Sequence, residues 1–304
     1  MTLLTTGLGA HIRSASIKGK VKGGENSARS ILFLVILWLS LFISFGVLLT
    51  LIITTLIDGA DRLDSRLFTE YPSSVPDQAG LRPAILGSIW VIGVTAILTI
   101  PLGVAAAIHL EEFADRKKWF NRVIELNVQN LAAVPSIVYG LLALAFLALL
   151  GVQNKNIVIG GALALGLLVL PVIIISTREA LRSVPVEIRQ GSLALGATPL
   201  QTVWRQTLPA SVPGIATGAI LGLSRALGEA APLLVLGALV FVSFDPNGLL
   251  SGYTTMPIQI FNWTSRPQAE FHDLAAAASI LLLGILIAMN GLAIFIRNRY
   301  QQRW

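Results

Sequence analysis

The sequence contains no cysteine, and only 12% of its 304 residues are charged. Without cysteine, neither a disulfide framework nor a thiolate metal site can form. A soluble domain usually carries about 25% charged residues, so the low share argues against a water-soluble fold. The three histidines, His11, His109 and His272, are far apart in the chain. They predict neither a metal site nor a histidine-based catalytic set.

Long apolar runs take the place of the missing charge. A helix needs about 20 apolar residues to cross a bilayer, and suitable runs lie near 31–57, 84–110, 129–150, 157–177, 215–243 and 274–296. The first run is about twice as long as a signal-peptide core, so it should remain as a membrane anchor. We therefore expect an all-α polytopic membrane protein with six transmembrane helices.

Lysine and arginine are distributed unevenly around these runs. Most of them fall in the two tails and in the loops after the second and fourth spans. By the positive-inside rule, both termini should lie in the cytoplasm. This bias accounts for the net charge of +6 and gives no reason to expect nucleic acid as a partner. The expected parts are a basic cytoplasmic tail (1–30), a first transmembrane helix (31–57), an external loop (58–83), a permease core with five further helices (84–296) and a cytoplasmic tail (297–304).

The internal loop 178–213 should be structured. Pro185 can open a helix that stops at Gly196, where glycine tolerates a left-handed backbone. Thr198 can cap a second helix with Pro199 at its first position, ending at Pro209. A plain connector commonly needs about 2 to 8 residues, so the loop predicts a docking surface for a cytoplasmic partner. The alternative is a pair of helices lying on the membrane surface.

A charged pair interrupts the fifth apolar run, which reads SRALGEAAPLL at 224–234. Arg225 and Glu229 are spaced one helical turn apart, and glycines on the same side favour close packing of another helix; these are Gly214, Gly218 and Gly222. One hypothesis makes the charges a mutually neutralising interface pair. The other makes Arg225 a fixed cation in an anion path, with Glu229 preventing the anion from being held too tightly.

The external loops 58–83 and 245–273 are acidic on balance and contain prolines, which favour irregular structure. Either they are solvated connectors, or they form a docking surface for an external protein.

The loop 178–213 resembles the cytoplasmic loop of binding-protein-dependent ABC importer permeases. The family pattern is EAA, three residues, Gly, nine residues and I-x-L-P, and it falls here on Gln190, Gly191, Ser192, Gly196, Gln206, Leu208 and Pro209. Gly196 and the Leu-Pro pair match, whereas the glutamate, both alanines and the isoleucine are replaced. Four further stretches resemble the phosphate-importing members of this family: VPSIVYGL at 134–141, SRALGEAAPLL at 224–234, MPIQIFNWTSRPQAEF at 256–271 and RNRYQQRW at 297–304.

The resemblance implies a type I-like permease bundle in a bacterial inner membrane, importing inorganic phosphate. It implies four kinds of neighbour: a second permease subunit, a dimer of ATPase subunits, an external phosphate-binding protein and the lipid bilayer. It also implies that the ATPase coupling loop includes Gln190, Gly191, Ser192, Gly196, Leu208 and Pro209. ATP and Mg²⁺ would bind to the partner ATPase and no cofactor to this chain, whose sequence lacks the phosphate-loop pattern G-x-x-x-x-G-K-[ST].

Two other functions remain as alternatives. In a secondary transporter or channel for an anion, Arg225 and Glu229 would act as an ion relay without any ATPase. A membrane-embedded enzyme would need a nucleophile–base or metal constellation, and the sequence offers none that can be assembled.

Overall fold

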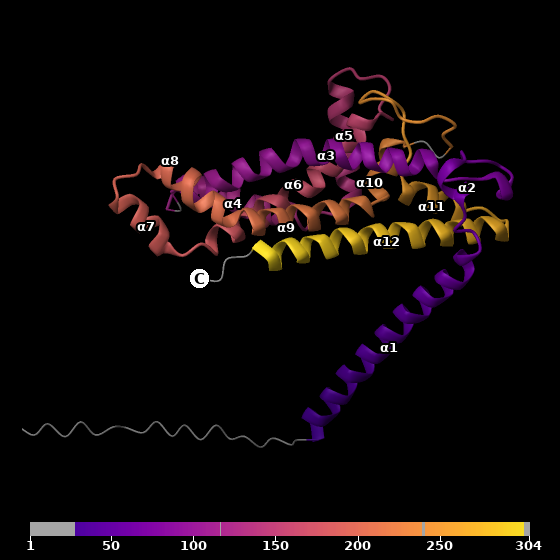
Figure 1. The fold of residues 1–304 in the computed structure, drawn as a ribbon, viewed down its shortest axis with the longest axis horizontal. Helices are drawn as coiled ribbons and strands as arrows, with labels where there is room; N and C mark the ends of the chain where they lie inside the picture. Colours follow the sequence, from indigo (N-terminus) through magenta and orange to yellow (C-terminus); the bar gives the residue numbers. More distant parts are fainter. Residues whose placement is uncertain (1–27, 116, 239–240, 301–304) are drawn as a thin grey trace, which may run out of the picture. The chain divides into compact units, whose positions relative to one another are not determined.

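The computed structural model describes residues 28–115, 117–238 and 241–300 (Figure 1). Every regular element in these ranges is helical, apart from one isolated antiparallel bridge between Ile157 and Gly252. This confirms the all-α prediction. The chain forms two compact units, Met1–Ile52 and Ile53–Trp304, each of which is considered by itself.

Helix α1 (Ala28–Ala60) is apolar around its whole circumference. Within its Ser30–Ala60 part an 18-residue stretch reaches a mean hydropathy of 2.8, and the side chains described in the first unit are exposed almost throughout. A helix without a polar face is typical of a membrane span. The helix covers the predicted first transmembrane segment 31–57, with slightly wider bounds.

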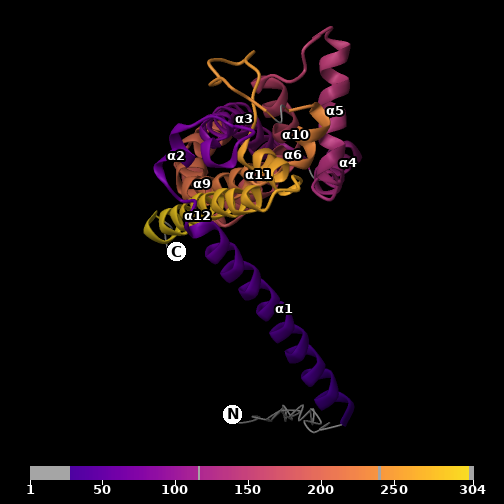
Figure 2. The ribbon, with the colours of Figure 1, turned by 90° about the vertical axis from the view of Figure 1, so that its right-hand side faces the viewer.

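The second unit is built on long apolar helices that run side by side (Figure 1). They are α3 (Arg82–Ile108, continued by the π-helical turn η2, His109–Phe113), α6 (Val158–Arg182), α9 (Leu208–Leu227) and α12 (Ala269–Tyr300). Helices α4 (Trp119–Leu131) and α5 (Ser136–Leu149) meet at 111° and lie on one side of this bundle (Figure 2). The described residues thus contain five helices able to span a membrane, or six if the bent pair counts as one span.

Shorter helices occupy the two ends of the bundle. Helices α7 (Val186–Ala194) and α8 (Pro199–Thr202) lie at one end, here called the loop end, while α2 (Ser65–Thr69) lies at the opposite end (Figure 1). The remaining elements are η1 (Pro76–Gln78), the π-helical turn η3 (Val203–Thr207), α10 (Ala231–Leu236) and α11 (Met256–Thr264). The predicted external loop 58–83 therefore contains helical turns.

The predicted span 215–243 was wrong at both ends. The helix begins far earlier, because α8, η3 and α9 form one apolar helix over Pro199–Leu227, and it ends at Leu227 with Gly228 as its C-cap. Only the short helix α10 follows, and Gly237 closes it with a φ of 87°. Glycine adopts this left-handed conformation without steric cost. Pro232 has no N–H to donate, so α9 cannot continue through it as a regular helix.

The same change moves the bounds of the predicted loop 178–213. Helix α6 continues to Arg182, and Pro209 does not end the second helix. At the π-helical turn η3, the Leu208 N–H donates to the carbonyl of Val203, five residues back. Pro209 comes directly after this wider turn. The helical hydrogen bonds there run to the residue five positions back instead of four, so the helix tolerates the N–H that proline lacks.

The core is centred on α6, which packs against α3, α5 and α9. Val91, Leu165, Val169, Ile173 and Leu223 form the middle of its main buried cluster. At the opposite end, the segment before α11 returns into the bundle: a Cβ on Gly87 would lie 2.0 Å from the Thr254 carbonyl oxygen. Close contacts of this kind require glycine.

Candidate functional site: the loop end and the break after α9

The predicted turn between two helices is present at the loop end. Gly196 has a φ of 84°, and α7 ends in a Schellman motif in which the Ala197 N–H donates to Ser192 and the Gly196 N–H to Leu193. Thr198 then caps α8 in a capping box with Gln201. The predictions for Gly196, Thr198 and Pro199 are confirmed, because each depends on local backbone chemistry.

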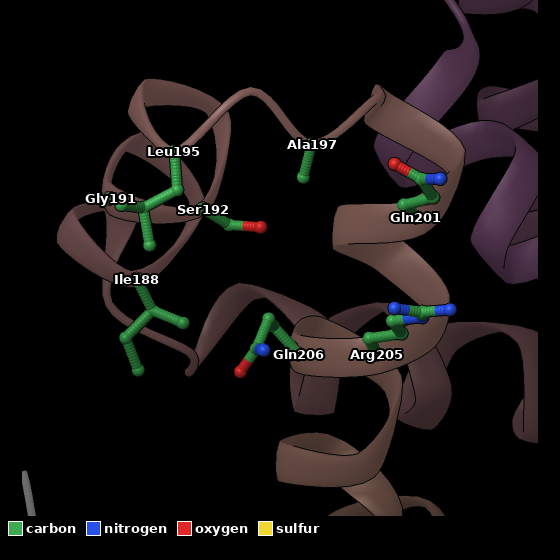
Figure 3. Close-up of a pocket in the computed structure, with 8 residues that line it drawn as sticks. All are labelled: Ile188, Gly191, Ser192, Leu195, Ala197, Gln201, Arg205 and Gln206. Carbon is green, nitrogen blue, oxygen red and sulfur yellow. The ribbon is translucent and has the colours of Figure 1, made fainter.

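A groove of about 380 Å³ separates α7 from α8 and η3 (Figure 3). The Ser192 and Thr202 hydroxyls, 2.9 Å apart, join the two helices. The residues that line the groove come from both sides and are mostly uncharged: Ile188, Gly191, Ser192, Leu195, Ala197, Gln201, Arg205 and Gln206. Gly191, Ser192 and Gln206, which the family pattern places far apart, thus line one groove.

Large apolar side chains at the loop end are left uncovered, and one of them, Leu195, lines the groove. Leu195 is 90% exposed, and Leu200 and Trp204 are more than half exposed. Gln190 also faces outward, whereas Leu208 and Pro209 lie in the first turn of α9. Exposed apolar side chains with polar residues beside them are typical of a surface that binds another protein.

A network of arginines and glutamates holds the loop end together. Arg178 donates to Glu111 at 3.1 Å and to Glu125 at 2.7 Å, and the side chains of Arg178 and Glu111 are only 6% and 5% exposed. Arg182 pairs with Glu111 at 2.8 Å, and Arg189 pairs with Glu112 at 2.8 Å. These arginines were predicted only as markers of the cytoplasmic side. A signal for their partners was present in the sequence HLEEF at 109–113, where two glutamates directly follow an apolar run.

The glycines of α9 lie where that helix approaches α6. A Cβ on Gly218 would lie 2.3 Å from the Ser176 hydroxyl oxygen, and a Cβ on Gly214 would lie 2.7 Å from the Ala180 Cβ. Gly222 has more room, with its nearest neighbour, Val169, at 3.4 Å. The three residues therefore let the two helices pack closely.

Arg225 lies in the last turn of α9, about three turns beyond Gly214 and on the same side. Its neighbour Ala226 packs with Val91 and Leu165, so the helix ends between α3 and α6 rather than at an end of the bundle. Glu229 lies past the Gly228 cap, so the two charges do not share one continuous helix as predicted. The Arg225 Nε and Glu229 Oε1 atoms are 3.9 Å apart, and the side chains are 58% and 22% exposed.

Among the described residues, no group of three histidine, aspartate or glutamate side chains is placed to hold a metal ion. His109 lies in η2, and the His272 ring contacts the Arg266 carbonyl through Nε2 at 2.7 Å. His11 lies outside the described residues.

Long apolar helices that lie side by side, with a helical hairpin at one end, are typical of a polytopic membrane protein. The family described as binding-protein-dependent transport system inner membrane component matches residues 99–303, and the chain belongs to that family. It is the multi-pass transmembrane permease subunit of an ABC importer.

Several relatives share most of the chain. The phosphate transport system permease protein PstA of Yersinia pestis is 33% identical over 258 residues, covering 83% of this chain and 85% of the relative. The probable ABC transporter permease protein YqgI of Bacillus subtilis is 32% identical over 250 residues, covering 76% and 83%. A chain of a bacterial alginate ABC transporter has the same fold, with a TM-score of 0.65 at 16% identity, covering 90% of this chain and 96% of that one.

Proposed function

We propose that the chain is the permease subunit of an ATP-driven importer of inorganic phosphate. The observation that carries this proposal is the likeness to phosphate transport permeases, which extends over most of both chains at 33% identity. The hairpin of α7 and α8, with its exposed Leu195, argues against a channel or secondary transporter, which needs no ATPase.

In this proposal the loop end faces the cytoplasm, as the arginine and lysine bias favours. The groove and its apolar rim receive an ATPase subunit, which binds ATP and Mg²⁺ and hydrolyses the nucleotide. The residues that contact it include Gln190, Gly191, Ser192 and Gly196, while Leu208 and Pro209 connect the hairpin to α9. A second permease subunit completes the path, and an external phosphate-binding protein delivers the anion at the opposite end.

The break after Leu227 provides the charge for the anion path. Arg225 makes no hydrogen bond within the described residues, so its guanidinium donors remain available to an oxyanion. Glu229, 3.9 Å away, offsets part of this attraction. A transport site must release its cargo, so a cation moderated by a nearby carboxylate suits it better than an isolated arginine.

The test is phosphate uptake by phosphate-starved cells that lack this chain, with and without a plasmid copy. We expect the copy to restore phosphate uptake and to leave sulfate uptake unchanged. Normal phosphate uptake without the chain would contradict the substrate. The alternative of a secondary transporter is separated by purification: a nucleotide-binding subunit that co-purifies with the chain supports the proposal, and transport by the purified chain alone contradicts it.

A further inference from the structure

Two consecutive glutamates in the π-helical turn η2 bind different helices. Glu111 accepts from Arg178 and Arg182, both at the end of α6. Glu112 accepts from Arg189 on α7, through Nη2 at 2.8 Å and through Nε at 3.3 Å. The end of α3 is thus fixed to α6 by one carboxylate and to α7 by the next.

Arg189 joins three elements at once. Besides Glu112, it donates to the carbonyl oxygens of Leu181 at 2.8 Å and Val184 at 2.7 Å, which close the end of α6. The planar guanidinium has enough donors in fixed directions for these contacts, and a lysine ammonium cannot reproduce them. The Glu112 side chain is 9% exposed, so water does little to weaken this pair.

Helix α7 has few other attachments to the membrane helices. None of its side chains is buried, and its packing neighbours are α8 and η3 within the same hairpin. Ser192 contacts Thr202, again inside the hairpin. Within the part of the chain that the structure describes, Arg189 is therefore the polar side chain that links the body of α7 to the ends of α3 and α6.

We propose that the Glu112–Arg189 pair is a positioning contact that transmits movement of α7 to α3. The inference rests on the proposed function, in which an ATPase subunit moves the hairpin. A bidentate charge pair holds a fixed distance and direction, whereas apolar side chains at an exposed hairpin can slide. With Glu111 held on α6, a displacement of α7 acts on α3 through Glu112, at the π-helical turn next to the membrane span.

The experiment uses the complete complex in lipid vesicles: this chain, its permease partner, the ATPase subunits and the binding protein. Two quantities are measured, the phosphate moved per ATP hydrolysed and the stimulation of ATP hydrolysis by the binding protein. The variants are Arg189→Gln, Glu112→Gln, Arg189→Lys and the exchange of Glu112→Arg with Arg189→Glu. Arg122→Gln is the matched control, since it also removes one positive charge, but Arg122 is exposed on α4 and forms no ion pair within the described residues.

We expect Arg189→Gln and Glu112→Gln to assemble and hydrolyse ATP while the phosphate moved per ATP falls at least about tenfold, because one partner of a largely buried pair is lost. Stimulation by the binding protein should fall with it. Arg189→Lys should lie between these variants and the wild type, the exchange should recover part of the loss, and Arg122→Gln should match the wild type.

The inference would be overturned if Arg189→Gln moved as much phosphate per ATP as the wild type and its ATP hydrolysis were stimulated equally by the binding protein. A second outcome would also overturn it: less complex assembles, but the complex that does assemble moves a normal amount of phosphate per ATP. The pair would then have only a structural role. If Arg189→Gln yields no complex, Arg189→Lys decides by the same two quantities. A wild-type complex stimulated by its binding protein that moves no phosphate contradicts the proposed substrate, and stimulation in the variants still tests the pair.

Discussion

The protein holds charges inside its helical bundle in two different ways. At the loop end, Arg178 is 6% exposed and has two glutamate partners at 3.1 Å and 2.7 Å. At the break after α9, Arg225 is 58% exposed and has one partner at 3.9 Å. Burying a charge is costly unless it is paired and hydrogen-bonded. Arg178 is paired and hydrogen-bonded within the chain, whereas the guanidinium donors of Arg225 make no hydrogen bond within the described residues.

This difference separates a structural role from a transport role. Arg178 is buried and already donates to two glutamates, so a passing anion cannot reach it easily, and its removal takes the most buried cation from Glu111. An arginine with open donors contributes little to the fold and can bind cargo. We expect stability to respond most to changes at the loop end and transport to respond most at the break. The predictions below run from the largest expected effect on the free energy of unfolding to the smallest.

Arg178→Gln should destabilise the protein most. It leaves Glu111 and Glu125 short of a cation, and breaking a buried pair from one side typically costs about 3–5 kcal/mol. Thermal unfolding of the purified protein in detergent measures the change. Arg182→Gln is the control, since Arg182 also binds Glu111 but is 38% exposed, and its effect should be smaller. Equal unfolding temperatures for Arg178→Gln and the wild type would contradict the structural role of the network.

Gly218→Val should weaken the contact between α9 and α6. The added side chain would collide with Ser176, because even a Cβ would lie 2.3 Å from its hydroxyl oxygen. Overpacking of this kind typically costs about 1–3 kcal/mol. Gly222→Ala is the matched control on the same helix, as a Cβ there meets only ordinary contacts from 3.4 Å outward. The same unfolding measurement applies, and a similar loss in both variants would show that close packing is not the cause.

Gly196→Val should strain the hairpin without affecting the spans. A β-branched residue with a φ near 84° is unfavourable by roughly 1–3 kcal/mol, and the strain is confined to the turn between α7 and α8. We expect normal insertion, while phosphate uptake falls relative to ATP hydrolysis. Gln190→Ala should have a milder effect on uptake.

The control for that prediction is Gly93→Ala, which adds a Cβ in open space on α3. Uptake at the wild-type level in Gly196→Val would show that the hairpin does not couple the ATPase to transport.

Arg225→Gln should change stability least and transport most. The free energy of unfolding should stay within about 0.5 kcal/mol of the wild type, as for an exposed residue. Phosphate uptake, normalised to membrane abundance and to recovered ATPase subunit, should be abolished. Adding Glu229→Gln should not restore it, since the cation is needed for the anion.

Recovery of uptake in the double variant would reverse this conclusion. Arg225 and Glu229 would then be a mutually neutralising pair, as in the other hypothesis, and the break would resemble the loop end.

Sequence reasoning worked where the cause is local and failed where it is not. Gly196, Thr198 and Pro199 were predicted in their observed positions because a left-handed glycine and a helix cap depend on adjacent backbone groups. The end of α9 at Leu227 was missed because the apolar run continues on both sides of Arg225 and Glu229, so hydropathy averaged over a span gives no boundary there. The continuation through Pro209 was missed because the π-helical turn at 203–207 shifts the hydrogen bonds around the proline.

The amino-acid sequence by itself determined the all-α membrane class, most of the spans and the hairpin at the loop end, because hydropathy and turn chemistry act over short stretches of chain. Only the tertiary structure decided that Arg189 pairs with Glu112, that Arg178 is buried while Arg225 is exposed, and that α9 stops between α3 and α6. These features join residues far apart in the chain. Their energies depend on burial and on directed hydrogen bonds, which come into being only when the helices pack.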